Sequence, residues 1–190
     1  IGERIRISGG GRCNFTNRVV EPDNFICNNP HFCKSALSRY TQWDFIAMVE
    51  RHGIDYEERR HSQLFCLHSA KDILAMLLGE CEAAGVEIST RCEIESVGAT
   101  PGSSSRYLLD LVQAGARRLI ACNSLVVATG ALSIPTLGGS GQGYEIARQF
   151  GLALTPRRAG LVPFMFSDAT RALCERLAGV SLEVSVGCNG

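Results

Sequence analysis

Apolar residues recur every three or four positions between Ser69 and Gly85, which is the spacing of a helix with one buried face. Ser69 begins this stretch and Asp72 follows three residues later, a capping-box pattern, while Gly85 suits the end of a helix. The pattern predicts a helix that packs on a sheet. Its apolar stripe consists of Ile73, Leu74, Leu77, Leu78 and Cys81.

Two shorter helices are expected upstream of this one. Residues Phe32–Tyr40 have the composition of a short helix, and a second capping box at Thr41 and Asp44 begins a helix that Gly53 ends. The buried face of this second helix is expected to consist of Phe45, Ile46 and Val49.

Strand patterns dominate the next part of the chain. Val86–Ser89 alternates apolar and polar residues directly after the long helix, so helix and strand form the second half of a crossover unit. Hairpin-type connections separate three short runs, Glu93–Val97, Tyr107–Val112 and Arg117–Ala121, which predict a meander. Ser124–Ala128 is a continuous apolar run, typical of a strand covered on both faces in a parallel sheet. Together these patterns predict an α/β, partial Rossmann-like domain.

The candidate chemistry begins at residues 8–17, which read Ser-Gly-Gly-Gly-Arg-Cys-Asn-Phe-Thr-Asn and follow at most a very short strand. Consecutive glycines carry no side chains, so the backbone can adopt positive φ and approach a ligand with its N–H groups exposed. Arg12 adds a fixed fork of donors, and Asn14 and Asn17 can both donate and accept. The segment predicts a loop that binds phosphate or a flat ring, and the competing interpretation is an ordinary surface loop.

Two further segments have small residues where a ligand would approach. Ala128-Thr129-Gly130 follows the predicted apolar strand, at the edge where open parallel sheets bind ligands. Gly138–Gly143 precedes a helix expected over Tyr144–Phe150, and the free N–H groups of a helix N-terminus suit a phosphate such as the pyrophosphate of NAD(P)H. Because other residues separate these glycines from the strand, we favour a simple connection with good caps.

Composition and charge limit the classes of function. The chain has 190 residues, 45% hydrophobic and 20% charged, which suits one domain and part of another. Basic and acidic residues number 19 each, so no overall field attracts nucleic acid or an anionic membrane. The local basic clusters Arg59-Arg60-His61, Arg117-Arg118 and Arg157-Arg158 are interpreted as solvated loop residues. No run approaches the ~20 apolar residues that span a bilayer, so no membrane partner is expected.

The nine cysteines show no C-x-x-C pair and no regular spacing, which argues against a disulfide framework and favours reduced thiols in the cytoplasm. The four histidines also lack metal-ligand spacing, so no metal is expected. Cys13 stays open, because a thiol beside Arg12 has the surroundings of a reactive cysteine, while packing or cofactor contact is the alternative.

Five blocks occur in an order that is hard to obtain by chance: Arg4–Asn17, Asn29–Phe32, Gln63–Cys66, Val126–Pro135 and Ala159–Phe164. They resemble the HI0933-like (BaiN/RdsA-type) family of bacterial NAD(P)- and FAD-dependent oxidoreductases. The resemblance covers essentially the whole chain, whereas the chain covers only about the middle of such a protein.

This resemblance implies an FAD-binding Rossmann-like domain of the two-dinucleotide-binding type over residues 1–163, followed by the start of an inserted β-rich domain over residues 164–190. Family members open with a G-x-G-x-x-G turn in a first βαβ element that is absent here, so we expect a fragment. Gly138–Gly143 lies near the flavin in this comparison. The implied FAD contacts are Ser8, Gly9, Gly10, Gly11, Arg12, Cys13, Asn14, Thr16, Asn17, the backbone of Ile94 facing the adenine, Ala128, Thr129 and Gly130.

The resemblance further implies that NAD(P)H reduces the flavin, which then transfers hydride to an activated C=C bond of an enone-like small molecule. Substrates among relatives range from steroid-type dienones to a uridine of ribosomal RNA, so an RNA-modifying enzyme that forms dihydrouridine is one alternative. A non-catalytic remnant that cannot hold FAD is another. Arg12 and Asn14 are candidates to orient the flavin or to polarise a substrate carbonyl, and no catalytic residue is assigned.

Overall fold

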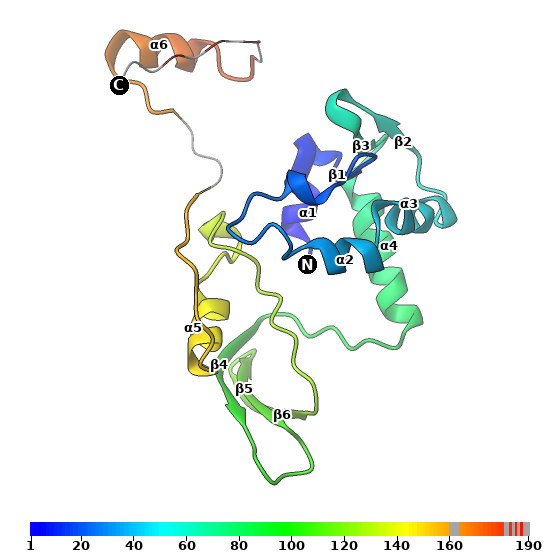
Figure 1. Ribbon diagram of the computed structural model, residues 1–190, viewed down its shortest axis with the longest axis vertical. Helices are drawn as coiled ribbons and strands as arrows, with labels where there is room; N and C mark the ends of the chain where they lie inside the picture. Colours follow the sequence, from blue (N-terminus) through cyan, green and yellow to red (C-terminus); the bar gives the residue numbers. More distant parts are fainter. Residues whose placement is uncertain (160–163, 181–182, 184, 186, 188–190) are drawn as a thin grey trace. The chain divides into compact units, whose positions relative to one another are not determined.

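The computed structural model describes residues 1–159, 164–180, 183, 185 and 187. The chain forms two compact units, residues 1–146 and 147–190, whose elements are labelled in Figure 1. The helices are α1 (Glu3–Ile7), α2 (Lys34–Arg39), α3 (Gln42–Arg51), α4 (Ala70–Ala83), α5 (Gln142–Gln149) and α6 (Asp168–Arg176). The strands are β1 (Asn14–Asn17), β2 (Tyr56–Glu58), β3 (Gln63–Cys66), β4 (Cys92–Ala99), β5 (Tyr107–Gln113) and β6 (Ala116–Cys122). Short 3₁₀ turns cover Ser8–Gly11, Pro22–Asn24, Arg60–Ser62 and Pro135–Leu137.

The first sheet has the strand order β1-β3-β2, and both neighbouring pairs are antiparallel. Its central strand β3 buries Leu64, Phe65 and Cys66. Cys13, which immediately precedes β1, is buried in the same core, so the glycine segment is anchored at its C-terminal end. The buried residues of this core are Cys13, Val49, Cys66, Ala70, Ile73 and Met76.

The three helices expected between residues 32 and 85 are confirmed as α2, α3 and α4. The N–H of Asp44 donates to the Thr41 hydroxyl, and the N–H of Thr41 donates back to the Asp44 carboxylate at 2.7 Å, so the predicted capping box is present. Ile46 and Val49 are buried as expected, while Phe45 is half-buried. In α4, the buried positions are Ala70, Ile73 and Met76, because this side of the helix faces the core.

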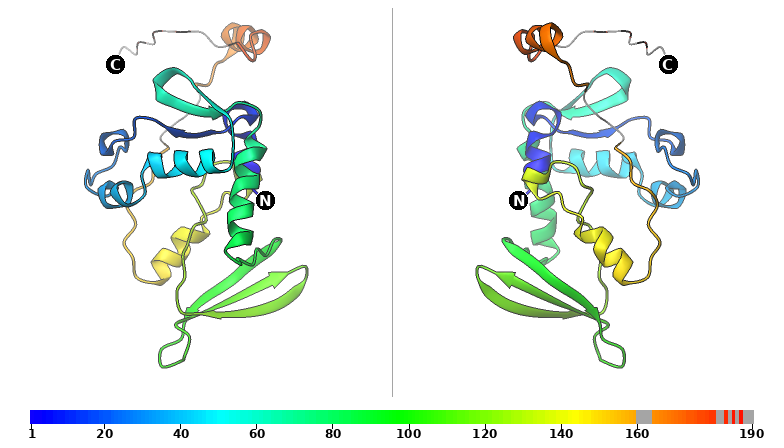
Figure 2. Two further views of the ribbon diagram at one scale, coloured as in Figure 1. Left: turned by 90° about the vertical axis from the view of Figure 1, so that its right-hand side faces the viewer. Right: turned by 90° about the vertical axis from the view of Figure 1, so that its left-hand side faces the viewer.

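The predicted meander is also confirmed, as an antiparallel sheet of order β4-β5-β6 whose strands lie side by side in Figure 2. Val97 and Leu111 are buried. Asp110, the neighbour of Leu111 along β5, is buried as well, and the guanidinium of Arg117 on the adjacent strand donates to its carboxylate. This charge-assisted bond lowers the pKa of Asp110.

Two predicted strands are wrong. Val86–Ser89 belongs to neither sheet of the described residues, and the N–H of Val86 donates instead to the Cys81 carbonyl, where it completes the end of α4. Ser124–Ala128 also belongs to no sheet among the described residues, and Val126 is 83% exposed. A strand of a parallel sheet needs hydrogen-bonded neighbours, and both described sheets are antiparallel sets that include neither segment.

The segment before the glycine cluster is helix α1 rather than a very short strand. α1 lies against α4, and a Cβ built at Gly2 would collide with Leu74 of α4, so glycine allows the close approach. The helix expected over residues 144–150 is present as α5, and Gly151 follows it with φ +71°. This expectation is confirmed with an earlier start, at Gln142.

The second unit contains α6 within its described part. Most of residues 181–190, in the region that the resemblance assigns to an inserted β-rich domain, lie outside the described residues, as does most of the block Ala159–Phe164. The boundary after residue 163 and the β-rich domain therefore stay predictions.

Candidate functional site

The glycine segment folds as a tight left-handed turn. Gly9, Gly10 and Gly11 have φ of +56°, +65° and +83°, and the N–H of Cys13 donates to the Ser8 carbonyl at 3.0 Å. A Cβ built at Gly9 would lie 2.6 Å from Cε1 of Phe65, whereas one at Gly10 would meet nothing within 4 Å. The positive φ predicted for these residues is confirmed, and the backbone at Gly10 is open to an approaching group.

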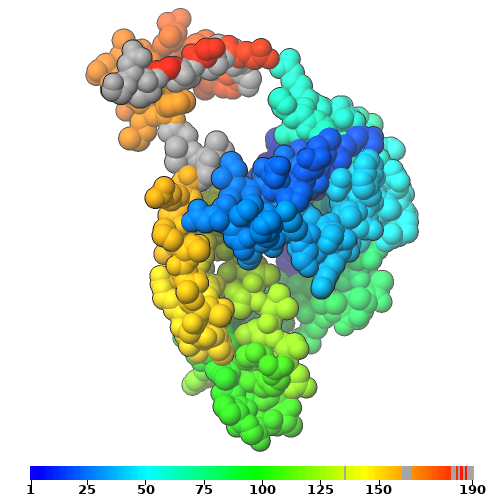
Figure 3. Space-filling view, in the orientation of Figure 1, coloured from blue at the N-terminus to red at the C-terminus, as the bar shows by residue number. Residues whose placement is uncertain are grey.

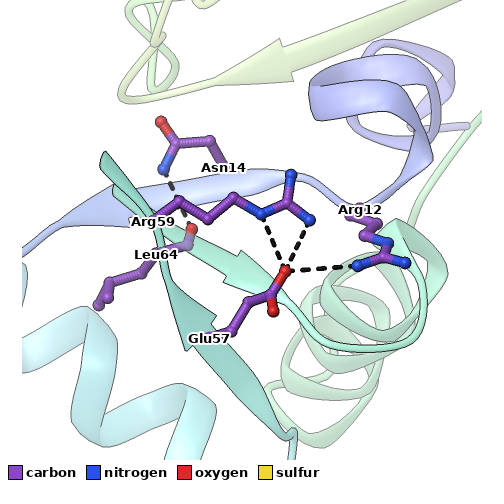
Figure 4. Close-up of polar contacts among 5 residues, drawn as sticks. All are labelled: Arg12, Asn14, Glu57, Arg59 and Leu64. Carbon is purple, nitrogen blue, oxygen red and sulfur yellow. Dashed lines mark hydrogen bonds and ion pairs between the residues drawn. The ribbon is translucent and has the colours of Figure 1, made fainter. Parts of the chain in front are cut away.

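Arg12 extends from this turn to a carboxylate of β2, the edge strand on the other side of β3. Its Nη1 lies 3.3 Å from Oε1 of Glu57, and the same oxygen accepts from Nε and Nη2 of Arg59 at 2.8 and 2.6 Å (Figure 4). The Arg59 guanidinium also lies over the Phe65 ring, 4.3 Å from its centroid. Arg59, followed by Arg12, holds the pKa of Glu57 below its usual range. An anionic Glu57 thus orients two half-exposed guanidinium groups at one edge of the sheet.

Asn14 joins the strands of the sheet. Its side-chain Nδ2 donates to the Thr16 carbonyl at 2.7 Å and to the Leu64 carbonyl at 3.0 Å, and Figure 4 shows the second of these bonds. These bonds lie at the position where the β1–β3 register shifts. The register shift leaves backbone carbonyls without their regular partners from the neighbouring strand. The Asn14 amide donates to two such carbonyls and therefore stabilises the irregular start of β1.

Cys13 has φ +51° and is 7% exposed. It packs in the core beside Cys66, where burial, followed by the proximity of Cys13, raises the pKa of the Cys66 thiol to about 11. Cys66 is therefore a neutral thiol near pH 7. Of the two roles left open for Cys13, the structure supplies the packing contacts.

Thr16 and Asn17, at the end of β1, line an open groove of about 740 Å³. The Nδ2 of Asn17 donates to the His61 carbonyl at 3.5 Å across one end of it. The lining residues are Thr16, Asn17, Val19, Val20, Asn24, Phe25, His61 and Ser62. Two of the predicted cofactor-binding residues thus face a separate surface, reached along β1 from the glycine turn.

The other predicted segment, Ala128-Thr129-Gly130, is largely exposed and follows the unpaired apolar run. Arg4 of α1 connects it to the glycine turn. Nη2 of Arg4 donates to the Ser133 carbonyl at 2.7 Å, and a Cβ built at Gly130 would lie 3.3 Å from Nη1 of Arg4. The structure therefore brings this segment to the helix that leads directly into residues 8–11.

Ile94 lies in β4, and its carbonyl accepts a hydrogen bond of 2.7 Å from Nε2 of Gln142. The backbone predicted to face an adenine is thus held by the first residue of α5. A Cβ built at Gly143 would collide with Thr129, so the glycine-rich segment packs closely on the segment before it.

Sequence reasoning missed Arg4, Glu57 and Phe65. Their partners lie far away along the chain: Arg4 contacts a residue 129 positions later and Arg12 one 45 positions later. The available signals were the blocks Arg4–Asn17 and Gln63–Cys66, which contain Arg4 and Phe65 and resemble the family, but neither residue was given a role.

Within the described residues, no group of three or more His, Cys, Asp or Glu side chains is arranged to hold a metal ion. No helix in that part of the chain is both long and apolar enough to cross a membrane.

Comparison with known proteins gives one family match: the model described as "HI0933-like protein Rossmann domain" matches residues 1–182. A protein from Escherichia coli (strain K12) named "Ribosomal RNA dihydrouridine synthase" is 49% identical over 181 residues, 95% of this chain and 44% of that protein. One of the same name from Haemophilus influenzae is 44% identical over 187 residues, 98% of this chain and 45% of that protein. A "3-dehydro-bile acid delta(4,6)-reductase" from Clostridium scindens is 25% identical over 162 residues, 85% of this chain and 38% of that protein. The chain spans less than half the length of these curated relatives.

Proposed function

We propose that this chain, which belongs to the family of HI0933-like protein Rossmann domains, contributes to a flavin-dependent enzyme that reduces uridine to dihydrouridine in ribosomal RNA. The observation that carries the proposal is the 49% and 44% identity, over nearly the whole chain, to two proteins that bear this activity in their names. The relative named as a bile-acid reductase is 25% identical. The alternative substrate of the sequence analysis is therefore favoured over the small enone.

Both substrate classes need the same chemistry. The C5=C6 bond of uridine is conjugated with a carbonyl, so it is an activated double bond of the enone type. A bound FAD, reduced by NAD(P)H, supplies the hydride for such a reduction. The protein has to bind the cofactor, orient the substrate and polarise its carbonyl.

The residues of the glycine turn fit the polar part of such a cofactor. Three successive glycines in the left-handed region present backbone without Cβ atoms, and Gly10 is open to solvent. Arg4 holds Ala128-Thr129-Gly130 near the same helix and turn. We infer that Ser8–Gly11 and residues 128–130 together contact the FAD, while Cys13 and Asn14 support the turn from below.

Arg12 is the candidate to orient the cofactor or to polarise the substrate carbonyl. Its side chain is 47% exposed, and its guanidinium pairs with Glu57 through Nη1. A guanidinium presents five donors, so a single ion pair leaves capacity for a second partner. Glu57 is a positioning residue, because its ion pair orients the Arg12 guanidinium.

The surface near this turn carries arginines that suit contact with RNA phosphates. Arg12, Arg18, Arg59 and Arg60 lie on or beside the first sheet, where Glu57 and Glu58 pair with three of them. A guanidinium has five N–H donors, so a paired arginine keeps further donors for a phosphate. The predicted cytoplasmic location fits an enzyme that acts on ribosomal RNA.

The test uses the intact protein, saturated with FAD and supplied with NADPH, on ribosomal RNA that lacks dihydrouridine. Mass spectrometry of RNA digests should detect a gain of two hydrogens in one uridine. We expect Arg12→Ala to lower the rate or the flavin content by at least tenfold. Arg6→Ala is the matched control, because Arg6 pairs with Glu3 within α1 and has no role in the site.

The remaining outcomes separate the alternatives. Reduction of a dienone without dihydrouridine formation would assign the protein to the small-molecule reductases. A protein that stays colourless with excess FAD would be the non-catalytic remnant. Equal activity of Arg12→Ala and Arg6→Ala would remove Arg12 from the site.

A further inference from the structure

The groove at the end of β1 is a surface of the first sheet that is separate from the glycine turn. One wall is the chain that leaves β1, with Asn17, Val19 and Phe25, and the other is the 3₁₀ turn with His61 and Ser62. In the space-filling view, the segment that follows β1 lies on the face toward the viewer (Figure 3). Phe25 is 45% exposed, so part of its ring is available to a ligand.

The two walls are joined by hydrogen bonds. The N–H of Arg18 donates to the Ser62 carbonyl at 2.8 Å, and the N–H of Val19 donates to the Ser62 hydroxyl at 3.3 Å. Both His61 and Ser62 have φ +58°, in the left-handed region that non-glycine residues rarely adopt. A residue in this region persists only where its surroundings enforce it, which is typical of binding sites.

The lining combines the two features that recognise an unpaired nucleobase. Phe25 offers an aromatic face for stacking, and the amides of Asn17 and Asn24 belong to the residue type that pairs with base edges. Arginines lie at the rim as well. Arg18 pairs with Glu58 at 2.6 Å and Arg59 with Glu57 at 2.6 Å, and Arg60 belongs to the same turn as His61.

We propose that this groove binds an unpaired base of the RNA substrate, with Phe25 stacked on the base and the arginines of the rim near its phosphates. The inference rests on the proposed function. β1 joins the groove to the glycine turn and has four residues, which span about 13 Å at ~3.3 Å per residue. A few nucleotides of a single strand cover this distance, so the groove holds a neighbour of the reduced uridine.

The experiment measures binding of a short fluorescein-labelled oligouridylate to the intact FAD-loaded protein by fluorescence anisotropy at two salt concentrations. We expect Phe25→Ala to weaken binding by about five- to a hundredfold, because base–aromatic stacking contributes on the order of 1–3 kcal/mol. Phe25→Tyr keeps the ring and should bind as the wild type does. Phe32→Ala is the matched control, since Phe32 is 79% exposed and lies outside the groove.

Salt dependence and flavin reduction give two independent readouts. Phe25→Ala should leave unchanged both the slope of affinity against salt and the rate of flavin reduction by NADPH. Arg18→Gln should lower the salt slope by about one, as expected for the loss of a phosphate contact. Binding of Phe25→Ala that equals that of Phe32→Ala overturns the proposal.

Three further outcomes contradict it in recognisable ways. If the wild type forms dihydrouridine and Phe25→Ala leaves KM for RNA unchanged, the groove proposal fails and the proposed function stands. If Phe25→Ala raises KM for NADPH and leaves RNA binding intact, the groove is a nicotinamide-nucleotide site. If the wild type neither binds oligouridylate nor forms dihydrouridine, the proposed function itself fails.

Discussion

The two segments predicted to meet the cofactor, Ser8–Asn17 and Ala128–Gly130, differ in how they are held. The first is a turn with a strained Cys13, a buried core contact, the ladder of β1 with β3 and the two bonds of Asn14. The second follows an exposed apolar run and meets two other segments: Arg4 of α1 donates to the Ser133 carbonyl, and Gly143 of α5 lies close to Thr129. One segment is held by its own sheet, while the other depends on contacts with α1 and the start of α5.

This difference shows that the two segments of the candidate site are preorganised to different degrees. A tight turn beside a packed strand is preorganised, so a ligand finds its N–H groups already placed. An extended segment without ladder bonds has many conformations of similar free energy, so it loses more entropy when it binds. The glycine turn is therefore the part of the site that this chain defines by itself.

The largest expected effect separates two neighbouring glycines of the turn. Gly9→Ala adds a Cβ 2.6 Å from Cε1 of Phe65 at a left-handed position, and we expect a loss of about 2–4 kcal/mol in the free energy of unfolding. Gly10→Ala meets nothing within 4 Å and should cost only about 1–2 kcal/mol of backbone strain. Urea denaturation measures both, and equal losses would show that Phe65 does not confine the turn.

The next effect tests the amide that holds β1. Asn14→Ala removes bonds to the Thr16 and Leu64 carbonyls, and we expect a loss of about 1–2 kcal/mol in the free energy of unfolding. Asn17→Ala removes one long contact of 3.5 Å and should stay within about 0.5 kcal/mol of the wild type. A reversed order of the two variants contradicts the assignment of Asn14 as the clamp.

A smaller effect is expected in the second segment. Arg4→Met removes the bond to Ser133, and amide hydrogen exchange in residues 128–134 should then accelerate while residues 8–17 keep their protection. The free energy of unfolding should change by less than about 1 kcal/mol, since the contact is exposed. Arg6→Met is the control. Exchange that accelerates equally in both segments would mean that they are held as one unit.

The smallest expected effect is a pH dependence of the stability that the Glu57 ion pairs contribute. Because Arg59 and Arg12 lower the pKa of Glu57, the ion pairs contribute stability that is present above the unfolded pKa of about 4.3 and is lost as the pH falls through the lower folded pKa. The urea midpoint of the wild type should exceed that of Glu57→Gln at pH 7, and the two midpoints should converge near pH 3. A gap that does not change with pH would assign the effect of the substitution to packing.

Much of the fold could be predicted because its signals are local. The capping boxes at Thr41 and Ser69 join residues three positions apart, and the strands of the meander pair with the next strand along the chain. The predicted strand at Val86–Ser89 was wrong because the alternating pattern describes side chains only. It does not show that the backbone N–H of Val86 donates to the Cys81 carbonyl at the end of α4 and is therefore not available to a sheet.

The candidate site divides in the same way. The glycines of the turn were found from the sequence, since positive φ is a property of the residue itself. The use of Asn14 as a clamp and the burial of Cys13 were not found, because they depend on β3, which lies about 50 residues away. The groove with His61 and Ser62 was hidden for the same reason, as its walls come from two separate segments.

The sequence by itself determined the helices α2, α3 and α4, the meander, the left-handed glycine turn and the family. Each of these depends on residues close together along the chain or on the order of short blocks. Only the tertiary structure decided that Arg12 meets Glu57, that Arg4 reaches Ser133 and that the apolar run Ser124–Ala128 pairs with no described strand. These are long-range pairings, and a residue's own propensity contains no information about which distant group will satisfy its charge or its hydrogen bonds.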